Sequence, residues 1–331
     1  MLLRIFKRTG PGVIFLIIII LIAVWVSAIL NQRLHPRFIY ESDPMPLYRF
    51  IKLLIHNSHN LGVILSFLLV SLMAFLMVNF NTTVFFIHER TFLPAFFYVL
   101  FGGLFPDQQL LNPVIPASIF LMLAIMRILD GYNKTGTAYN YFDAGILIST
   151  GSLFYANLIW FGLLVIIGIA LLRTGNAKEI VISVLGLLTP YLIIFGIYYV
   201  LGKDIFALIK LIGDNLFTRS TFYPLPRLTI LALIFSGALI LASFVQLMNR
   251  MNSKKIKSRK TFSLMIWTLL ISITVYFALP SASVELIWVM SIPVSYFLTH
   301  YFVFVKKKLV PEILFSLLCF FILLIQIWYL R

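Results

Sequence analysis

Two carboxylates stand close together in the segment Glu41-Ser42-Asp43-Pro44. Carboxylates at positions i and i+2 can bind a divalent cation, or one of them can act as a general base. Alternatively, Asp43 caps a helix that begins at the following prolines. The sequence leaves both interpretations open, and Asp43 and Glu41 are its candidate catalytic residues.

Three of the five histidines, His35, His56 and His59, lie in the same stretch of the chain. A bare H-x-x-H pair with neither cysteines nor an H-E-x-x-H context is a weak indication of zinc. The other interpretation places these side chains among lipid headgroups. No cofactor is therefore predicted with certainty. A divalent cation is the one possible cofactor, and the identity of any metal is unknown.

Arg37, Arg219 and Arg227 are the candidate substrate-binding residues. The planar fork of a guanidinium matches the oxygens of a phosphate, so these side chains could hold a lipid-linked phosphate. Arginines beside a membrane also contact anionic headgroups, and this second interpretation is the more general one. Either way, the predicted partner is a membrane lipid, with polyprenyl phosphate as the specific candidate.

The composition decides what kind of scaffold must position these residues. Hydrophobic residues make up 61% of the 331, and only 11% are charged, against roughly 25% charged in a soluble domain. A bilayer accommodates so much apolar surface because lipid replaces water around the helices. The net charge of +15 then reflects lysines and arginines in short cytoplasmic loops rather than nucleic-acid binding.

Apolar runs near or above the roughly 17 residues needed to span a bilayer predict an all-α, polytopic transmembrane protein. They cover 12–30, 61–80, 111–129, 156–172, 180–201, 228–248, 261–279, 284–304 and 310–330. Two shorter runs, 91–106 and 142–155, are either spans or re-entrant elements. The prediction is about eleven spans, with nine as the alternative, in a single domain of residues 1–331.

The placement of basic residues predicts the orientation. With eleven spans and a cytoplasmic N-terminus, 17 of the 26 lysines and arginines lie inside, including the clusters at 250–260 and 306–308. This split follows the positive-inside rule and places the C-terminus outside. The apolar run behind Arg4, Lys7 and Arg8 is longer than that of a signal peptide, so it is expected to remain as the first span.

The two longest outer loops, 31–60 and 202–227, each contain an amphipathic pattern. In the first, Leu47, Phe50 and Leu54 share one helical face, and the second has a similar apolar stripe. Such segments form helices that lie along the membrane surface. We therefore expect surface helices at 46–57 and 203–217.

Few ionisable residues fall within the spans. Glu285 and Glu312 stand at helix starts, where an acid complements the helix dipole. Neither these acids nor Asp130 and Asp143 form the mid-bilayer relay expected of an ion-coupled transporter. No Ser-His-Asp, G-x-S-x-G or Cys-His pattern is present either, so the sequence does not decide whether the protein is an enzyme.

The middle of the chain resembles a domain-of-unknown-function family of bacterial polytopic inner-membrane proteins. The resemblance covers roughly residues 85–200. It is carried by Leu111-Asn112, Leu123-Ala124 with Arg127-Ile128, Phe142-Asp143-Ala144-Gly145, Ser152-Leu153-Phe154-Tyr155 and Pro190-Tyr191. It implies the bacterial inner membrane, and no established activity accompanies it. In that membrane, the orientation that the basic residues predict places the N-terminus in the cytoplasm and the C-terminus in the periplasm.

The layout is also similar, more distantly, to that of the GT-C glycosyltransferases. Those enzymes have an acidic catalytic residue in a first outer loop with surface helices, and they use polyprenyl-linked sugars. Two hypotheses follow: a GT-C-like transferase in envelope biogenesis, or a non-enzymatic component of an envelope assembly, lipid-handling or transport system. An outer cleft that encloses Glu41 or Asp43 would favour the first; the protein partners are not predicted.

Overall fold

A computed structural model of the chain describes residues 2–7, 10–30, 42–56, 58–132, 138–172, 177–220, 225–305 and 309–330. Every regular element in these ranges is a helix, which confirms the all-α prediction for the described part of the chain.

The first half contains α1 (Leu2–Phe6), α2 (Pro11–Leu30), α4 (Pro46–Leu54), α5 (His59–Val84), α6 (Leu93–Gly102), the 3-10 turn η1 (Pro106–Gln109), α7 (Val114–Asp130), α8 (Ala138–Ser152), η2 (Ala156–Phe161) and α9 (Gly162–Leu172). The second half contains α10 (Ala177–Val200), α11 (Ile205–Phe217), α12 (Arg227–Asn249), η3 (Met251–Ser253), α13 (Ile256–Ala278), η4 (Val284–Leu286), α14 (Ile287–Phe304) and α15 (Leu309–Leu330).

Seven helices in the described ranges are long and apolar enough to cross a membrane: α2, α5, α10, α12, α13, α14 with η4, and α15. This number is below the nine to eleven spans that we predicted. The run at 91–106 becomes the 10-residue α6, and the run at 142–155 becomes part of the 15-residue α8. An α-helix rises about 1.5 Å per residue, so α6 covers only about half of a hydrocarbon core roughly 30 Å thick.

The short helices are tolerated because protein surrounds them. All ten residues of α6 are buried, and the helix packs against α14 and α5. Backbone that is not helical at membrane depth is acceptable where protein, not lipid, surrounds it. Glycines and Pro106 end α6, and the chain then forms the buried turn η1 instead of a longer helix.

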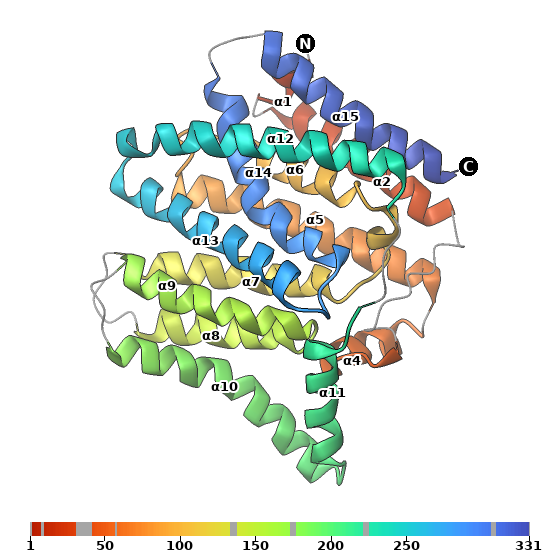
Figure 1. Cartoon of the computed structure of the whole chain (residues 1–331), viewed down its shortest axis with the longest axis vertical. Coiled ribbons are helices and arrows are strands. Elements are labelled where there is room, and N and C mark those ends of the chain that lie inside the picture. The colour runs from red at the N-terminus through yellow and green to blue at the C-terminus, as the bar shows by residue number, and fades with distance from the viewer. Residues whose placement is uncertain are drawn as a thin grey trace.

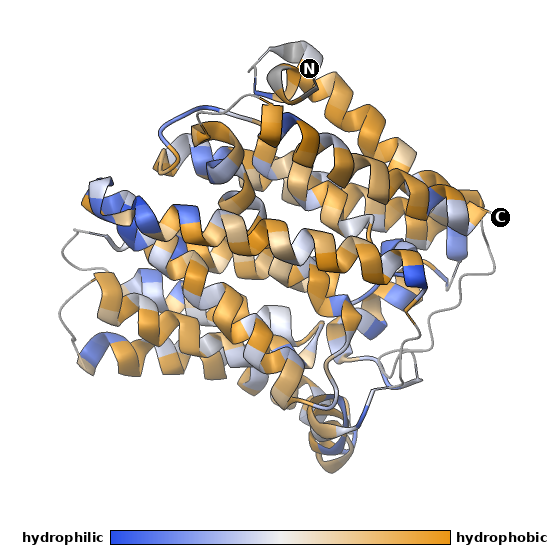
Figure 2. Cartoon of the chain, turned by 45° about the horizontal axis from the view of Figure 1, so that its top comes forward, coloured by the Kyte–Doolittle hydropathy of each residue, from blue (hydrophilic) through white to orange (hydrophobic). Residues whose placement is uncertain are grey.

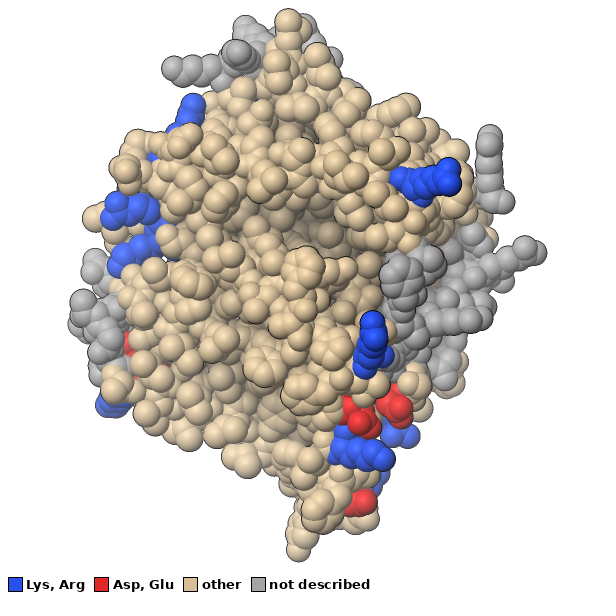
Figure 3. Space-filling model, viewed as in Figure 1, with Lys and Arg blue, Asp and Glu red and all other residues tan. Residues whose placement is uncertain are grey.

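Most long helices run alongside one another in Figure 1, and their connections gather at two ends of the bundle. One end holds α4, α11 and the connections α6–α7, α8–η2 and α13–η4; we call it the α11 end. Hydrophobic residues dominate the helices in Figure 2, while hydrophilic residues gather toward helix ends and connections. In the face shown in Figure 3, lysines and arginines lie near both ends, with a broad uncharged region between them.

The two predicted surface helices are present, slightly shorter than expected. In Figure 1, α11 crosses the direction of the neighbouring α8 and α9 instead of running alongside them. On α4 only Tyr48 is buried, while Phe50 and Leu54 are exposed. On α11 only Leu208 is buried, and Phe206 is exposed. Each helix therefore presents apolar side chains that protein does not cover, as expected of a helix in a membrane interface.

Candidate functional site

An apolar groove of about 240 Å³ lies at the α11 end, between α12, α13 and the start of α14. It is lined by Phe105, Leu225, Leu233, Ile273, Tyr276, Phe277, Ser283, Val284, Leu286, Ile287 and Met290. We call it the α12–α13 groove. Ten of these eleven side chains are aliphatic or aromatic, so the groove suits a hydrocarbon group and offers little to a polar ligand.

The rim of this groove carries a predicted site residue. Leu225 lines the groove, and Arg227, two residues later, is the first residue of α12 and is exposed. An apolar groove close to an exposed arginine could serve a lipid, because the groove suits a hydrocarbon chain and the cation suits an anionic headgroup.

A second predicted arginine, Arg219, is exposed and joined to the same region through its neighbours. The Ser220 N–H donates to Pro280 O over 2.8 Å, and Ser281 Oγ donates to Leu216 O over 2.7 Å. These bonds tie the end of α11 to the α13–η4 connection, which continues into the groove-lining Ser283. Arg219 and Arg227 are therefore brought to one end of the protein, although no described contact joins them.

Asp43 also lies at the α11 end. Its backbone oxygen accepts a hydrogen bond of 2.9 Å from Asn215 Nδ2 of α11, and its side chain is exposed. In Figure 3, acidic and basic side chains gather at this corner. Asp43 lines neither of the two hollows that the structure describes, the α12–α13 groove and a hollow along α15. Arg37 and Glu41, the other two predicted site residues, lie outside the described residues.

The histidines of the first long loop form no metal site within the described residues. His56 Nδ1 contacts Leu54 O at 3.2 Å, and His59 Nε2 contacts Ala28 O at 3.3 Å. In the described ranges, no group of three or more His, Cys, Asp or Glu side chains is placed to hold a metal. His35 and Glu41 lie outside those ranges, so the predicted divalent cation stays a prediction.

A buried polar cluster lies beside the groove, and sequence reasoning missed it. Tyr155 OH donates to Glu285 Oε1 over 3.1 Å, and Asn157 Nδ2 donates to Tyr155 OH over 3.3 Å and to Ser281 Oγ over 3.0 Å. The Ser283 N–H also donates to Glu285 Oε1, over 2.9 Å. We call these five residues the Glu285 cluster.

We predicted Glu285 only as an acid that complements a helix start. Its position before α14 agrees with that role, but its side chain is 1% exposed. One signal was available: Glu285 is the only acidic residue between Asp214 and Glu312. An isolated acid within an apolar stretch needs partners from elsewhere in the fold, because an unpaired buried charge is costly.

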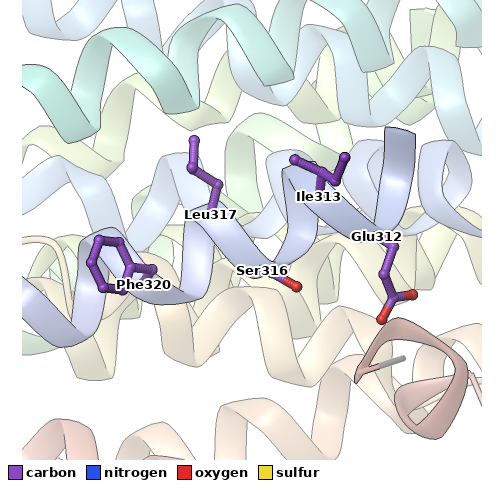
Figure 4. A pocket seen from close by; sticks show the side chains of 5 residues that line it. All are labelled: Glu312, Ile313, Ser316, Leu317 and Phe320. Carbon is purple, nitrogen blue, oxygen red and sulfur yellow. The ribbon is translucent and has the colours of Figure 1, made fainter. Parts of the chain in front are cut away.

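The opposite end of the bundle holds a hollow of about 440 Å³ along α15, shown in Figure 4. It is lined by Glu312, Ile313, Ser316, Leu317 and Phe320, which come from one helix. Glu312 Oε1 accepts a hydrogen bond from the Leu3 N–H over 3.2 Å, so this carboxylate helps to hold α1 against α15. The hollow offers no convergent set of polar groups from several elements.

A family model of the Family of unknown function (DUF6427) matches residues 43–330. The chain belongs to this family. The match extends well beyond the region 85–200 in which the resemblance to an uncharacterised family was seen. The matched region includes Asp43, Arg219, Arg227 and the Glu285 cluster. Arg37 and Glu41 lie before it. No curated protein and no solved structure matches the chain.

Proposed function

We propose that this DUF6427 protein binds an anionic membrane lipid at the α11 end, with the hydrocarbon chain in the α12–α13 groove and the phosphate at Arg227 and Arg219. The observation that carries this proposal is the apolar groove lined by Leu225, which stands two residues before the exposed Arg227.

The surroundings of the groove support a lipid as its occupant. Ile234 of α12 is 65% exposed and Phe277 of α13 is 81% exposed, so the helices that border the groove also present apolar side chains that lipid chains would cover. A cavity of about 240 Å³ is small for a whole lipid, and it fits the part of one chain nearest the headgroup. The rest of that chain would lie along α12 and α13.

The membrane position of this site is part of the proposal. We propose that four shorter apolar segments, namely α6 continued by η1, α7, α8, and η2 with α9, also cross the bilayer beside the seven long helices, which gives eleven crossings. The basic clusters near 250–260 and 306–308 then lie in the cytoplasm. The α11 end faces the periplasm of a bacterial inner membrane, and the C-terminus lies on the same side.

Lipid retention tests the proposal. Native mass spectrometry of the purified full chain with phosphatidylglycerol should show bound lipid. Replacing Arg227 with Gln should weaken that binding about fivefold, since a cation near an anionic headgroup contributes about 1 kcal/mol. Arg259→Gln, which removes an exposed charge from the first turn of α13 at the other end, is the matched control. Equal binding by the two variants would contradict the proposal.

A second pair of variants tests whether a lipid chain lies in the α12–α13 groove. Leu233→Phe places a larger side chain in the groove, whereas Leu231→Phe makes the same change on an exposed part of α12. Only the first should displace a lipid that carries a photoreactive group on its chain. If both variants crosslink as the wild type does, the chain does not lie in the groove.

A GT-C-like glycosyltransferase is the second candidate, and the location of Asp43 at the same end favours it. A polyprenyl-phosphate sugar is an anionic lipid that suits the proposed site. Asp43 would take the proton from an acceptor hydroxyl, whose oxygen forms a bond to the sugar C1. The bond from C1 to the phosphate oxygen would break, and polyprenyl phosphate would leave with the electron pair. We place lipid binding first because the α12–α13 groove supports it directly.

The Asp43→Asn variant separates the two candidates. It keeps the shape of the side chain and the backbone bond to Asn215 but removes the base, whose contribution is typically about 10²- to 10⁴-fold. A transferase should lose function in a complementation assay at normal abundance in the membrane. Full complementation would leave a lipid-handling role without sugar transfer.

A further inference from the structure

The polar side chains of the α12–α13 groove lie at the α11 end, and the deeper lining is apolar. Among the residues that line the groove, only Tyr276 and Ser283 carry a hydroxyl group. Tyr276 stands two residues before the last residue of α13, and Ser283 immediately precedes η4. Leu233 lies six residues after Arg227, which is about 9 Å along α12. A ligand that enters from the α11 end therefore meets the hydroxyls first and hydrocarbon side chains beyond them.

The two hydroxyl-bearing side chains differ in what they can offer to a ligand. The Ser283 side chain is hydrogen-bonded to the Glu285 carboxyl, and Ser283 is only 8% exposed. Tyr276 is 39% exposed, and among the described residues its hydroxyl has no hydrogen-bond partner. A tyrosine hydroxyl can donate a hydrogen bond to a carbonyl oxygen. Tyr276 is therefore the residue of the groove lining that can donate a hydrogen bond to a bound molecule.

A donor at this position distinguishes two classes of anionic lipid. In a diacyl glycerophospholipid, an ester carbonyl joins each hydrocarbon chain to the glycerol, next to the phosphate. In a polyprenyl phosphate, the chain is bonded to a phosphate oxygen, and no carbonyl is present. Tyrosine suits the boundary between headgroups and hydrocarbon, because its ring is apolar and its hydroxyl takes a polar partner. With the phosphate at Arg227 and the chain beside Leu233, an ester carbonyl would lie between the two, at the end of the groove where Tyr276 stands.

We propose that Tyr276 OH donates a hydrogen bond to the ester carbonyl of a glycerophospholipid in the α12–α13 groove, and that this bond selects ester-linked lipids. The selection rests on the proposed function, because it requires an anionic lipid at this site. It narrows the ligand from anionic lipids in general to the diacyl glycerophospholipids. A polyprenyl-phosphate ligand, which the transferase candidate needs, would gain nothing from this hydrogen bond.

Two lipids that differ only at the carbonyl test the proposal. Native mass spectrometry of the purified full chain can measure competition between dipalmitoyl phosphatidylglycerol and its dihexadecyl ether analogue, in which a methylene group replaces each carbonyl. The wild type should bind the ester lipid about fivefold more tightly, the size expected of one hydrogen bond. Tyr276→Phe removes the hydroxyl and keeps the ring, so this variant should bind the two lipids equally, with its affinity for the ether lipid unchanged.

Tyr199→Phe is the matched control, because Tyr199 of α10 is 75% exposed and does not line the groove. It should keep the wild-type preference for the ester lipid. Equal binding of the two lipids by the wild type would overturn the proposal, and so would an ester preference that Tyr276→Phe retains. In both cases lipid binding itself would still be observed, and its loss in Arg227→Gln would still support the proposed function. A wild type that retains neither lipid would contradict the proposed function and this selection together.

Discussion

The contact between α8 and α10 depends on two facing glycines, and Gly186→Ala is the sharpest test of how these helices pack. A Cβ atom at Gly186 would lie 2.3 Å from Phe142 O and 3.1 Å from Phe142 C. The first distance is more than 1 Å shorter than the 3.4 Å at which ordinary van der Waals contact begins. The obstacle is backbone, which cannot rotate away as a side chain can, so the two helices must move apart.

The expected cost follows from two opposing effects. Overpacking of this kind costs up to about 3 kcal/mol, while alanine in place of glycine within a helix gains about 1 kcal/mol. The net loss of about 2 kcal/mol lowers the ratio of folded to unfolded protein about 30-fold. Gly145→Ala should behave similarly, because its Cβ would lie 2.5 Å from Ser183 O.

Gly196→Ala on the same helix is the matched control, since a Cβ there would meet nothing within 4 Å. This variant should be as stable as the wild type or slightly more stable. Unfolding of the purified variants in detergent, followed by tryptophan fluorescence, measures the difference. If Gly186→Ala and Gly196→Ala unfold at the same midpoint, then α8 and α10 do not approach as closely as described.

Three further predictions concern other parts of the chain. Burial and the neighbouring Arg250 lower the pKa of Lys254 to about 8. Between about pH 8 and 10.5 the unfolded chain therefore binds more protons than the folded chain, so the free energy of unfolding should rise with pH across that window. Lys254→Met should abolish this rise, measured as the unfolding midpoint at each pH. Reporter fusions at Ser253 and Ser220 should report opposite compartments, cytoplasmic and periplasmic, and one shared compartment would refute the proposed topology. Spin labels along 47–56 should alternate between lipid and water exposure with a helical period, whereas uniform lipid exposure would refute a surface location for α4.

The sequence alone determined the elements whose signal is local. Helix α12 covers Arg227–Asn249 where 228–248 was predicted, and α15 covers Leu309–Leu330 where 310–330 was predicted. The stripes of apolar residues likewise located α4 and α11 to within a few residues. These elements are predictable because hydrophobicity and its period act over neighbouring residues, independently of the rest of the fold.

Candidate site residues were predictable only one at a time. Residue type marked Asp43, Arg219 and Arg227 as suited to bind phosphate or to act as a base, and the fold brings all three to the α11 end. Whether they act together stays a prediction. Their common location depends on bonds such as Asn215 to Asp43, which joins residues 172 positions apart and leaves no local signal.

Only the tertiary structure decided which apolar segments are covered by protein and which stay exposed. Of the apolar window in Val284–Phe304, 83% is buried inside the protein, against 17% for α10. Hydropathy favours removal from water equally in both cases, so it cannot distinguish a lipid neighbour from a protein neighbour. For the same reason the sequence overestimated the number of long spans: protein packs around α6 and α8, so their lengths need not match the bilayer. The burial of Glu285 was hidden too, since its partners at 155 and 283 meet it only when separate connections converge.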